Sequence, residues 1–334
     1  MNRLRIIFCG TPQFATPSLQ HLLAQPDFEL IAVYTQPDRP KGRSQEISFS
    51  PVKQIALDAK LPVHQPAKMR APEVEAQLRD LAPDVIVIIA YGQIIPARLL
   101  DIPKFGWLNL HASLLPKYRG AAPVHWAVAH GETVTGNTTM RIDAGMDTGE
   151  ILLQQQLAIG PNETSPHLSA RLAEAGAALM AETLRGLAAH SIKPRAQDNS
   201  RATLAPILKR EDGLIDWSRP AAEIYNRQRA FTPWPGSYSE FRGQSCHLLL
   251  LPASNQQELA ATAVLPGTVF PPDTVLAPGT IVPREKSVTV ACGQESFLQL
   301  TGIKLEGRKL VSAGDFVHGA RLQVGERFGT GGLR

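Results

Sequence analysis

Hydrophobic residues in the first 190 positions form short continuous runs, and these alternate with segments in which the apolar residues have the spacing of a helix. The runs at 5–9, 29–34, 84–90 and 107–111 are apolar, and turn residues follow them, so we predict four buried strands. The spacing at 17–24 predicts a helix between the first two strands. Strands that alternate with helices are typical of βαβ units, so we expect an α/β fold with a Rossmann-type parallel or mixed sheet.

The remainder of this region predicts two more strands and one long helix. The strands are expected around 138–140 and 151–155, on either side of a loop from 141 to 150 that contains two glycines. Ser165 is a natural N-cap, and the apolar residues that follow recur at steps of three and four. We expect this helix to end near His190.

The pattern changes after residue 190. Residues 191–206 are polar and show no period, which is typical of a linker. A helix is predicted at 221–229, and 253–278, rich in Pro, Ala and Thr, is expected to be a long loop. Short strands with turn residues between them favour a small OB-like β-barrel; they are predicted at 238–242, 247–251, 280–282, 287–291 and 297–300. We therefore expect one domain over 1–189, a linker over 190–207 and a second domain over 208–334.

Composition narrows the class of protein. The chain has 334 residues, of which 43% are hydrophobic and 19% charged, as in ordinary globular proteins. Its longest apolar run, 85–91, falls short of the roughly 20 residues of a membrane helix, and the first residues do not form a secretory signal. We expect a cytoplasmic protein with no membrane partner. The three cysteines show no CxxC spacing, which argues against a disulfide framework or a structural zinc site.

Charge is distributed unequally. Residues 1–189 carry 17 basic and 17 acidic side chains, whereas residues 190–334 carry 17 basic and 13 acidic ones. The whole formal charge of +4 therefore falls in the C-terminal part. This asymmetry is a weak indication of an anionic partner there.

The densest group of chemically useful residues follows the strand at 107–111. Asn109 and His111 are two positions apart, so both side chains point to the same face of a strand. An amide can donate a hydrogen bond to a carbonyl oxygen that gains negative charge, and an imidazole can donate or relay a proton near neutral pH. The alternative is a structural strand end with a satisfied histidine.

A carboxylate is the expected third member of this group. Asp143 and Asp147 both lie in the glycine-containing loop, which can turn back toward the strand ends. The alternative for this loop is a solvated hairpin with an Asx turn. The spacing alone does not choose between the two aspartates.

Phosphate-binding chemistry has three candidate places. The turn at 10–14 lacks both the G-x-G-x-x-G and the G-x-x-x-x-G-K-[ST] pattern, which disfavours an NAD-dependent oxidoreductase. Basic residues on the loop at 36–44 and at the start of the second domain are candidate phosphate contacts, although solvated surface charge is the commoner explanation of such runs. These candidates are Arg39, Lys41, Arg43, Lys209 and Arg210.

Several separate segments, taken in order, resemble the folate-dependent formyltransferase family. The segments are FCGTPQF at 8–14, TQPDRP at 35–40, NLHASLLPKYRGAAP at 109–123, MDTGE at 146–150, LKREDG at 208–213, IDW at 215–217 and RAFTPWPG at 229–236. The resemblance covers nearly the whole chain. It implies a folate-binding catalytic domain of Rossmann type followed by a β-barrel domain that binds tRNA.

The resemblance also implies an activity and a set of site residues. The reaction would move a formyl group from the co-substrate 10-formyltetrahydrofolate to the α-amino group of initiator methionyl-tRNA, for translation initiation. The implied catalytic residues are Asn109, His111 and Asp147, with no metal ion. The implied folate-binding residues are Ser113, Leu114, Leu115 and Pro116, to which the strand-end position adds Ala90, Tyr91, Gly92 and Gln93. The loop with Arg43 would meet the acceptor stem, and we expect a monomer.

Two alternatives remain open at this point. One is a related formyltransferase that acts on an amino sugar or a purine precursor, since the chemical core would be shared. The other is a non-catalytic RNA-binding protein. The basic residues favour tRNA over a sugar, and the presence of Asn109, His111 and Asp147 together favours an enzyme.

Overall fold

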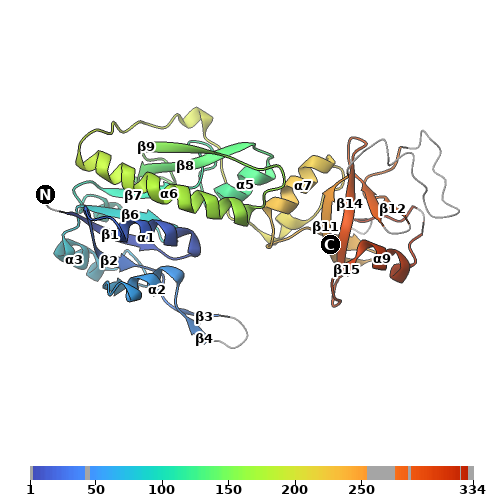
Figure 1. Ribbon diagram of the computed structural model, residues 1–334, viewed down its shortest axis with the longest axis horizontal. Helices are drawn as coiled ribbons and strands as arrows, with labels where there is room; N and C mark the ends of the chain where they lie inside the picture. The colour runs from blue at the N-terminus through green and yellow to red at the C-terminus, as the bar shows by residue number, and fades with distance from the viewer. Residues whose placement is uncertain (1–2, 42–45, 254–274, 285–286, 324, 330–334) are drawn as a thin grey trace. The chain divides into compact units, whose positions relative to one another are not determined.

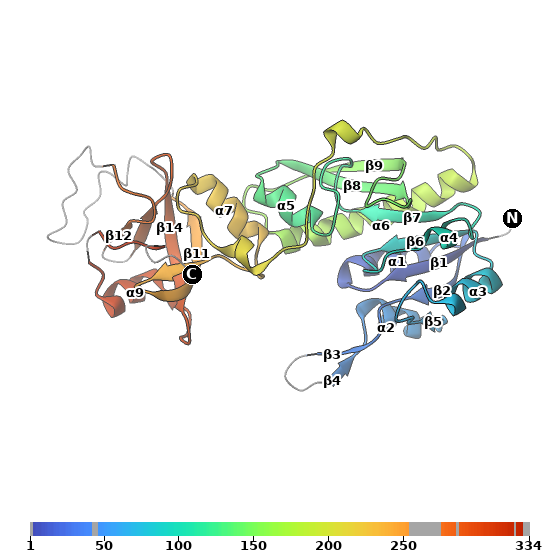
Figure 2. The same cartoon turned by 180° about the vertical axis from the view of Figure 1, so that it is seen from behind.

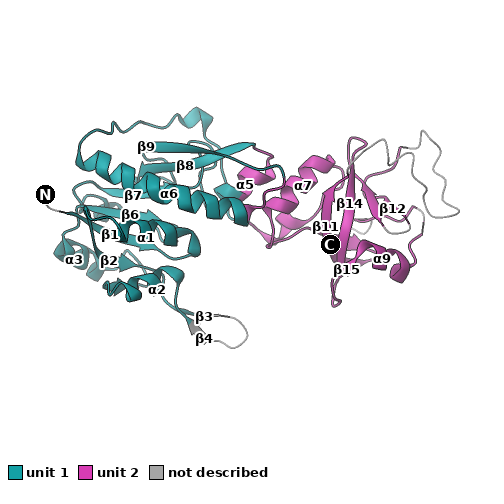
Figure 3. Cartoon of the chain, in the orientation of Figure 1, with its two compact units in different colours: residues 1–124, 133–161, 166–207 teal, residues 125–132, 162–165, 208–334 magenta. Residues whose placement is uncertain are grey.

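The computed structural model describes residues 3–41, 46–253, 275–284, 287–323 and 325–329, with only the backbone described at 40, 41, 46 and 47. The chain divides into two compact units (Figure 3). Unit 1 comprises 1–124, 133–161 and 166–207, and unit 2 comprises 125–132, 162–165 and 208–334. Most of the predicted long loop, 254–274, lies outside the described residues.

A seven-stranded mixed sheet forms the centre of unit 1 (Figure 1). Its order is β5-β2-β1-β6-β7-β8-β9, parallel from β5 to β7 and antiparallel from β7 to β9. The strands are β1 (Leu4–Gly10), β2 (Phe28–Tyr34), β5 (Val63–His64), β6 (Val85–Ile89), β7 (Trp107–His111), β8 (Val134–Arg141) and β9 (Ile151–Ala158). The predicted mixed sheet is confirmed, and the carboxyl ends of β1, β6 and β7 come together at one edge.

Helices cover both faces of this sheet (Figures 1 and 2), because alternate strand residues point to opposite sides. Ile6 and Phe8 of β1 pack with three of the helices, and Ile7 and Cys9 pack with two others. The first group is α1 (Thr16–Leu23), α2 (Pro51–Asp58) and α6 (Ser165–Ala188), and the second is α3 (Pro72–Leu81) and α4 (Ala97–Leu100). The long helix α6 was predicted, whereas α2, α3, α4, β5 and the 3-10 turn η1 (Gln13–Ala15) were not.

Two segments that the sequence assigns to loops have more structure than expected. The basic loop at 36–44 is in part a hairpin, in which β3 (Arg39–Lys41) pairs antiparallel with β4 (Glu46–Ser48). Residues in this hairpin are mostly polar, so hydrophobic periodicity does not reveal it. The segment 191–207 contains the 3-10 turn η2 (Asn199–Arg201) and makes backbone hydrogen bonds with β9 through Arg195.

Unit 2 is built around an antiparallel sheet of order β10-β11-β14-β13-β12, with β15 paired to β14. Its core is rich in aromatic residues, including Trp217, Phe241, Phe316 and Phe328. Helix α5 (Pro123–Ala129) belongs to unit 2 from residue 125 onward. The other elements of unit 2 are η3 (Arg210–Gly213), α7 (Ala221–Ala230), β10 (Tyr238–Phe241), β11 (Gln244–Pro252), β12 (Ile281–Pro283), β13 (Val288–Ala291), β14 (Phe297–Leu305), β15 (Val311–Ser312) and α9 (Ala313–Ala320). The five predicted strands and the predicted helix are all present, and the sequence missed α5, β15 and α9.

Candidate active site

Asn109 and His111 lie near the carboxyl end of β7, the last of the parallel strands. Asn109 is beside Ile88 of β6 and Met140 of β8, and His111 is opposite Thr138. Their spacing of two places both side chains on one face of the sheet. Within the described part of the chain, the amide of Asn109 makes no hydrogen bond to protein, so it is available to a ligand.

The imidazole of His111 is buried and held from both sides. Its Nε2 lies 2.8 Å from the carbonyl oxygen of Tyr118, and its Nδ1 lies 3.6 Å from Oδ2 of Asp147. A carbonyl oxygen only accepts hydrogen bonds, so Nε2 must carry the hydrogen. The neutral ring therefore presents the unprotonated Nδ1 to the carboxylate, and a proton taken up by the ring goes to that atom.

The structure distinguishes the two aspartates of the 141–150 loop. Asp147 turns toward His111, and its Oδ2 accepts a hydrogen bond from the backbone N–H of Gly120 at 2.7 Å. Asp143 is exposed, and its Oδ1 accepts from Gly145 N and Thr148 Oγ1. The Asx-turn alternative thus applies to Asp143, and the converging carboxylate is Asp147.

The segment 113–116 is tied to β8 by Thr138. The hydroxyl of Thr138 donates to Ser113 O at 2.6 Å and accepts from Leu115 N at 3.1 Å. Ser113 and Leu115 are buried, whereas Leu114 and Pro116 are partly exposed. Sequence reasoning missed Thr138, since nothing in its local pattern indicates that it holds a loop about 25 residues earlier in the chain.

The segment 90–93 presents mainly backbone to the outside. Ala90 and Gly92 are exposed and have left-handed φ angles of 48° and 83°. Tyr91 is buried, with its hydroxyl donating to Met69 Sδ, and the Gln93 side chain accepts from Met69 N and donates to Pro66 O. Of the four residues predicted to bind folate here, two therefore have side chains occupied by structural contacts.

A cavity of about 520 Å³ opens beside this segment in unit 1. It is lined by Thr11 and Gln36 after β1 and β2, by Phe49 and Ser50 after the hairpin, and by Gly92. Such a position, beyond the carboxyl ends of parallel strands, is where ligands bind in open α/β sheets. The volume is within the range of small-molecule sites.

One wall of this cavity is stabilised by a half-buried ion pair between Asp38 and Lys53. The Lys53 ammonium also donates to Gln65 Oε1 at 2.8 Å and lies 4.0 Å from the centre of the Phe49 ring. The hydrogen bond from Lys53 is the main cause that lowers the pKa of the Asp38 carboxyl below its ordinary value. These contacts anchor the base of the hairpin that carries Arg39.

The residues predicted to contact tRNA are only partly described. Arg39 is exposed, the structure describes Lys41 by its backbone alone, and Arg43 lies outside the described residues. Lys209 and Arg210 of unit 2 are exposed, and the described residues provide no ion-pair partner for either. Their charge is therefore available to an anionic ligand.

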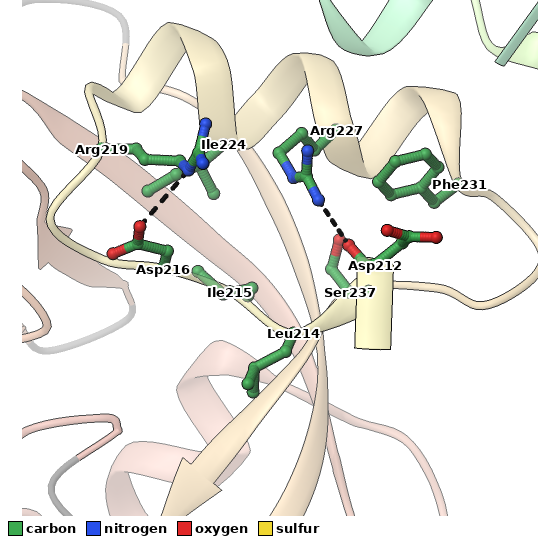
Figure 4. Close-up of a pocket in the computed structure, with 10 residues that line it drawn as sticks. Asp212, Leu214, Ile215, Asp216, Arg219, Ile224, Arg227, Phe231 and Ser237 are labelled. Carbon is green, nitrogen blue, oxygen red and sulfur yellow. Dashed lines mark hydrogen bonds and ion pairs between the residues drawn. The ribbon is translucent and has the colours of Figure 1, made fainter. Parts of the chain in front are cut away.

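Unit 2 contains a much smaller hollow, of about 10 Å³, next to η3 and α7 (Figure 4). Arg227 lies against the Phe231 ring there and donates to the carbonyl oxygen of Asp212 at 2.9 Å, and Arg219 pairs with Asp216 (Figure 4). A space of this size holds about one water molecule. The hollow is therefore a packing detail and not a substrate site.

Three further features of the described residues concern possible metal ligands, long apolar helices and cysteines. These residues contain no group of three His, Cys, Asp or Glu side chains that could hold a metal ion. They also contain no helix that is long and apolar enough to cross a bilayer. Cys9, Cys246 and Cys292 are buried and unpaired, and burial raises the pKa of the latter two thiols to about 12. Such thiols are poor nucleophiles.

Comparison with protein families matches both parts of the chain. Residues 3–184 match the model described as "Formyl transferase", and residues 207–321 match "Formyl transferase, C-terminal domain". Among curated proteins, the methionyl-tRNA formyltransferase of Solibacter usitatus is 47% identical over 330 residues, 99% of this chain and 100% of the relative. That of Geobacter sulfurreducens is 45% identical over 332 residues, 99% of both chains.

Solved structures share the fold at low sequence identity. WlaRD, a sugar 3N-formyl transferase crystallised in the presence of dTDP and 5-N-formyl-THF, aligns with a TM-score of 0.63 and 18% identity, over 92% of this chain and 100% of that chain. HypX from Aquifex aeolicus in complex with tetrahydrofolic acid aligns with a TM-score of 0.58 and 17% identity, over 95% of this chain and 48% of the HypX chain. At this level of identity the likenesses show the fold alone and carry no information on substrate.

Proposed function

The chain belongs to the formyl transferase family, and on that premise we propose that it transfers the formyl group of 10-formyltetrahydrofolate to the α-amino group of initiator methionyl-tRNA. The observation that carries this proposal is the near-full-length match to proteins named methionyl-tRNA formyltransferase. The family chemistry needs a carbonyl-polarising donor and a proton acceptor at one place. Asn109, His111 and Asp147 supply these two functions.

Asn109 is the proposed donor to the formyl oxygen. When the amine adds to the formyl carbon, that oxygen gains negative charge, and a donor positioned beforehand stabilises it by roughly 3 kcal/mol. The Asn109 amide is suited to this role because no described residue occupies it. In a site partly shielded from water, the interaction is stronger than in bulk solvent.

His111 and Asp147 are the proposed proton acceptors. The hydrogen on Nε2 is held by the Tyr118 carbonyl, so Nδ1 and the facing Asp147 Oδ2, 3.6 Å apart, are the atoms that can receive the amine proton. Asp147 would also stabilise the imidazolium that forms. The proton passes, directly or through one water molecule, to the folate nitrogen as its bond to the formyl carbon breaks, so that tetrahydrofolate leaves and no covalent enzyme intermediate is needed.

The co-substrate is proposed to lie along segments 90–93 and 113–116. The exposed backbone at Ala90 and Gly92 and the outward-facing Leu114 and Pro116 support this placement, since a flat heteroaromatic ring needs backbone hydrogen bonds and apolar contact. A Cβ added at Gly92 would meet only the Gln36 amide, so the surface there is open. When bound, the folate supplies the formyl group.

The acceptor end of the tRNA is proposed to enter the 520 Å³ cavity. Phe49, which is 48% exposed at its rim, offers a ring on which a base can stack. Arg39, Lys41, Arg43, Lys209 and Arg210 are proposed to contact phosphates. We also propose that the enzyme acts as a monomer in the cytoplasm.

A formyl-transfer assay with 10-formyltetrahydrofolate tests the proposal. Initiator methionyl-tRNA, elongator methionyl-tRNA and free amino sugars are supplied in parallel as acceptors. Transfer confined to the initiator tRNA is the expected result. Transfer to an amino sugar alone would leave the catalytic residues in place and overturn the tRNA assignment, and no transfer at all would favour a non-catalytic RNA-binding protein.

A further inference from the structure

Gln197 occupies a central position among the loops that surround Asp147, although it lies in the polar segment after α6. Its Nε2 donates to the carbonyl oxygens of Asp147 at 2.9 Å and Gly149 at 2.8 Å. Its Oε1 accepts from Arg119 Nε at 3.1 Å and Nη2 at 2.7 Å. Both ends of the amide are therefore used, and they connect the loop that begins after His111 with the loop that contains Asp147.

Arg119 is the other half of this connection. Its side chain is buried at 7% exposure, and its Nη2 also donates to Asn199 Oδ1 at 2.8 Å. The residue that follows it, Gly120, donates its backbone N–H to the Asp147 carboxylate. Arg119 thus directly precedes the backbone N–H that donates to the Asp147 carboxylate.

The backbone of Asp147 adopts an uncommon conformation that needs support. Its φ of 55° lies in the left-handed region, which aspartate tolerates better than most residues with a side chain but which is still less favourable than the right-handed region. Such conformations persist where surrounding contacts impose them. The two hydrogen bonds from Gln197 hold the carbonyl groups on either side of Thr148, and thereby the turn that directs the carboxylate to His111.

We propose that Gln197, together with Arg119, is a positioning residue for Asp147, a role that rests on the proposed function of the His111–Asp147 pair. Gln197 lies 50 positions from Asp147 and 78 from Arg119, and it does not itself take part in proton transfer. Without its NH₂ group, the Asp147 and Gly149 carbonyls lose their donor and the turn relaxes. The carboxylate then moves away from Nδ1.

Two substitutions at this position separate positioning from general stability. Gln197→Ala removes both ends of the amide. Gln197→Glu keeps an acceptor for the Arg119 guanidinium, but it turns a carboxylate oxygen toward two carbonyl oxygens. We expect both variants to lower kcat about 10-fold to 100-fold, with KM for each substrate within about twofold, since small displacements of a catalytic group have effects of this size.

Asn199→Ala is the matched control. It removes one hydrogen bond from the same guanidinium and leaves Gln197 in place, so we expect kcat within about twofold of wild type. Combining Gln197→Ala with Asp147→Ala supplies the second test. If Gln197 acts through Asp147, the double variant is no slower than Asp147→Ala, whereas independent effects would multiply and overturn the proposal.

An NMR measurement on the free protein, without substrate, tests the positioning role independently of the proposed function. In the free protein, the NMR signal of His111 Cε1–Hε1 reports the nearby carboxylate. We expect Gln197→Ala to move it in the same direction as Asp147→Ala and Asn199→Ala to leave it in place. An unmoved signal in Gln197→Ala would overturn the positioning role, whichever amine the wild-type enzyme formylates.

Discussion

Units 1 and 2 use their buried polar groups differently. In unit 1, several gather around one strand end, where His111, Ser113, Arg119 and Thr138 are buried and hydrogen-bonded. The core of unit 2 instead combines a cluster of aromatic rings with aliphatic side chains, and its cations at 209–210 stay on the surface. A satisfied polar network is rigid, and rigidity is what a catalytic group needs. An exposed cation suits long-range attraction of a polyanion.

The largest effects are expected at the strand end in unit 1. Asn109→Ala removes the proposed oxyanion donor, and His111→Ala or Asp147→Ala removes a proposed proton acceptor, so we expect kcat to fall about 10²-fold to 10³-fold in each. Dissociation constants for tRNA, measured by filter binding, should change little. Near wild-type turnover in His111→Ala would contradict the assignment of this site.

In unit 2 the largest expected effect is on stability. Phe328 is 2% exposed and lies 5.7 Å, between ring centres, from both Trp217 and Phe241. Phe328→Ala should therefore cost about 3–5 kcal/mol, which scanning calorimetry detects as a lowered Tm. Leu310→Ala, at a side chain that is 55% exposed, is the control and should leave Tm within about one degree. An unchanged Tm in Phe328→Ala would mean that the aromatic cluster does not stabilise this unit.

A smaller effect is expected from the surface cations of unit 2. Lys209→Ala and Arg210→Ala each remove one exposed charge, so we expect the KM for tRNA to rise about threefold to tenfold and kcat to stay constant. The slope of log affinity against log salt should fall by about one for each lost phosphate contact. A tRNA affinity that is insensitive to salt in the wild type would remove the basis of this role.

The smallest effect is expected at Asp143, four residues before Asp147, the proposed catalytic aspartate. Its carboxylate caps an exposed turn through Gly145 and Thr148 and faces no catalytic group among the described residues. Asp143→Asn keeps an acceptor in place, so kcat should stay within about twofold of wild type. Steady-state kinetics of Asp143→Asn and Asp147→Asn, measured side by side, make the comparison. Equal losses of kcat in the two variants would contradict the different roles that the loop geometry gives the two aspartates.

Much of the fold follows from local patterns. The apolar runs at β1, β6 and β7 predict a buried sheet, and the helical spacing after Ser165 predicts α6. Hydrophobic pattern does not reveal the β3–β4 hairpin or β15, because these strands are short and largely polar or exposed. The extended conformation of these strands depends on pairing with a neighbouring strand and not on burial of one face.

The candidate site, too, could be predicted only in part from the sequence. The sequence by itself determined that Asn109 and His111 share a face, because side chains in a strand repeat every two residues. Only the tertiary structure decided between Asp143 and Asp147, directed His111 Nε2 to the Tyr118 carbonyl, and brought Gln197 to the site. These choices depend on contacts between residues far apart in the chain, and such contacts exist only after the sheet has set its strand order and the loops have closed over its edge.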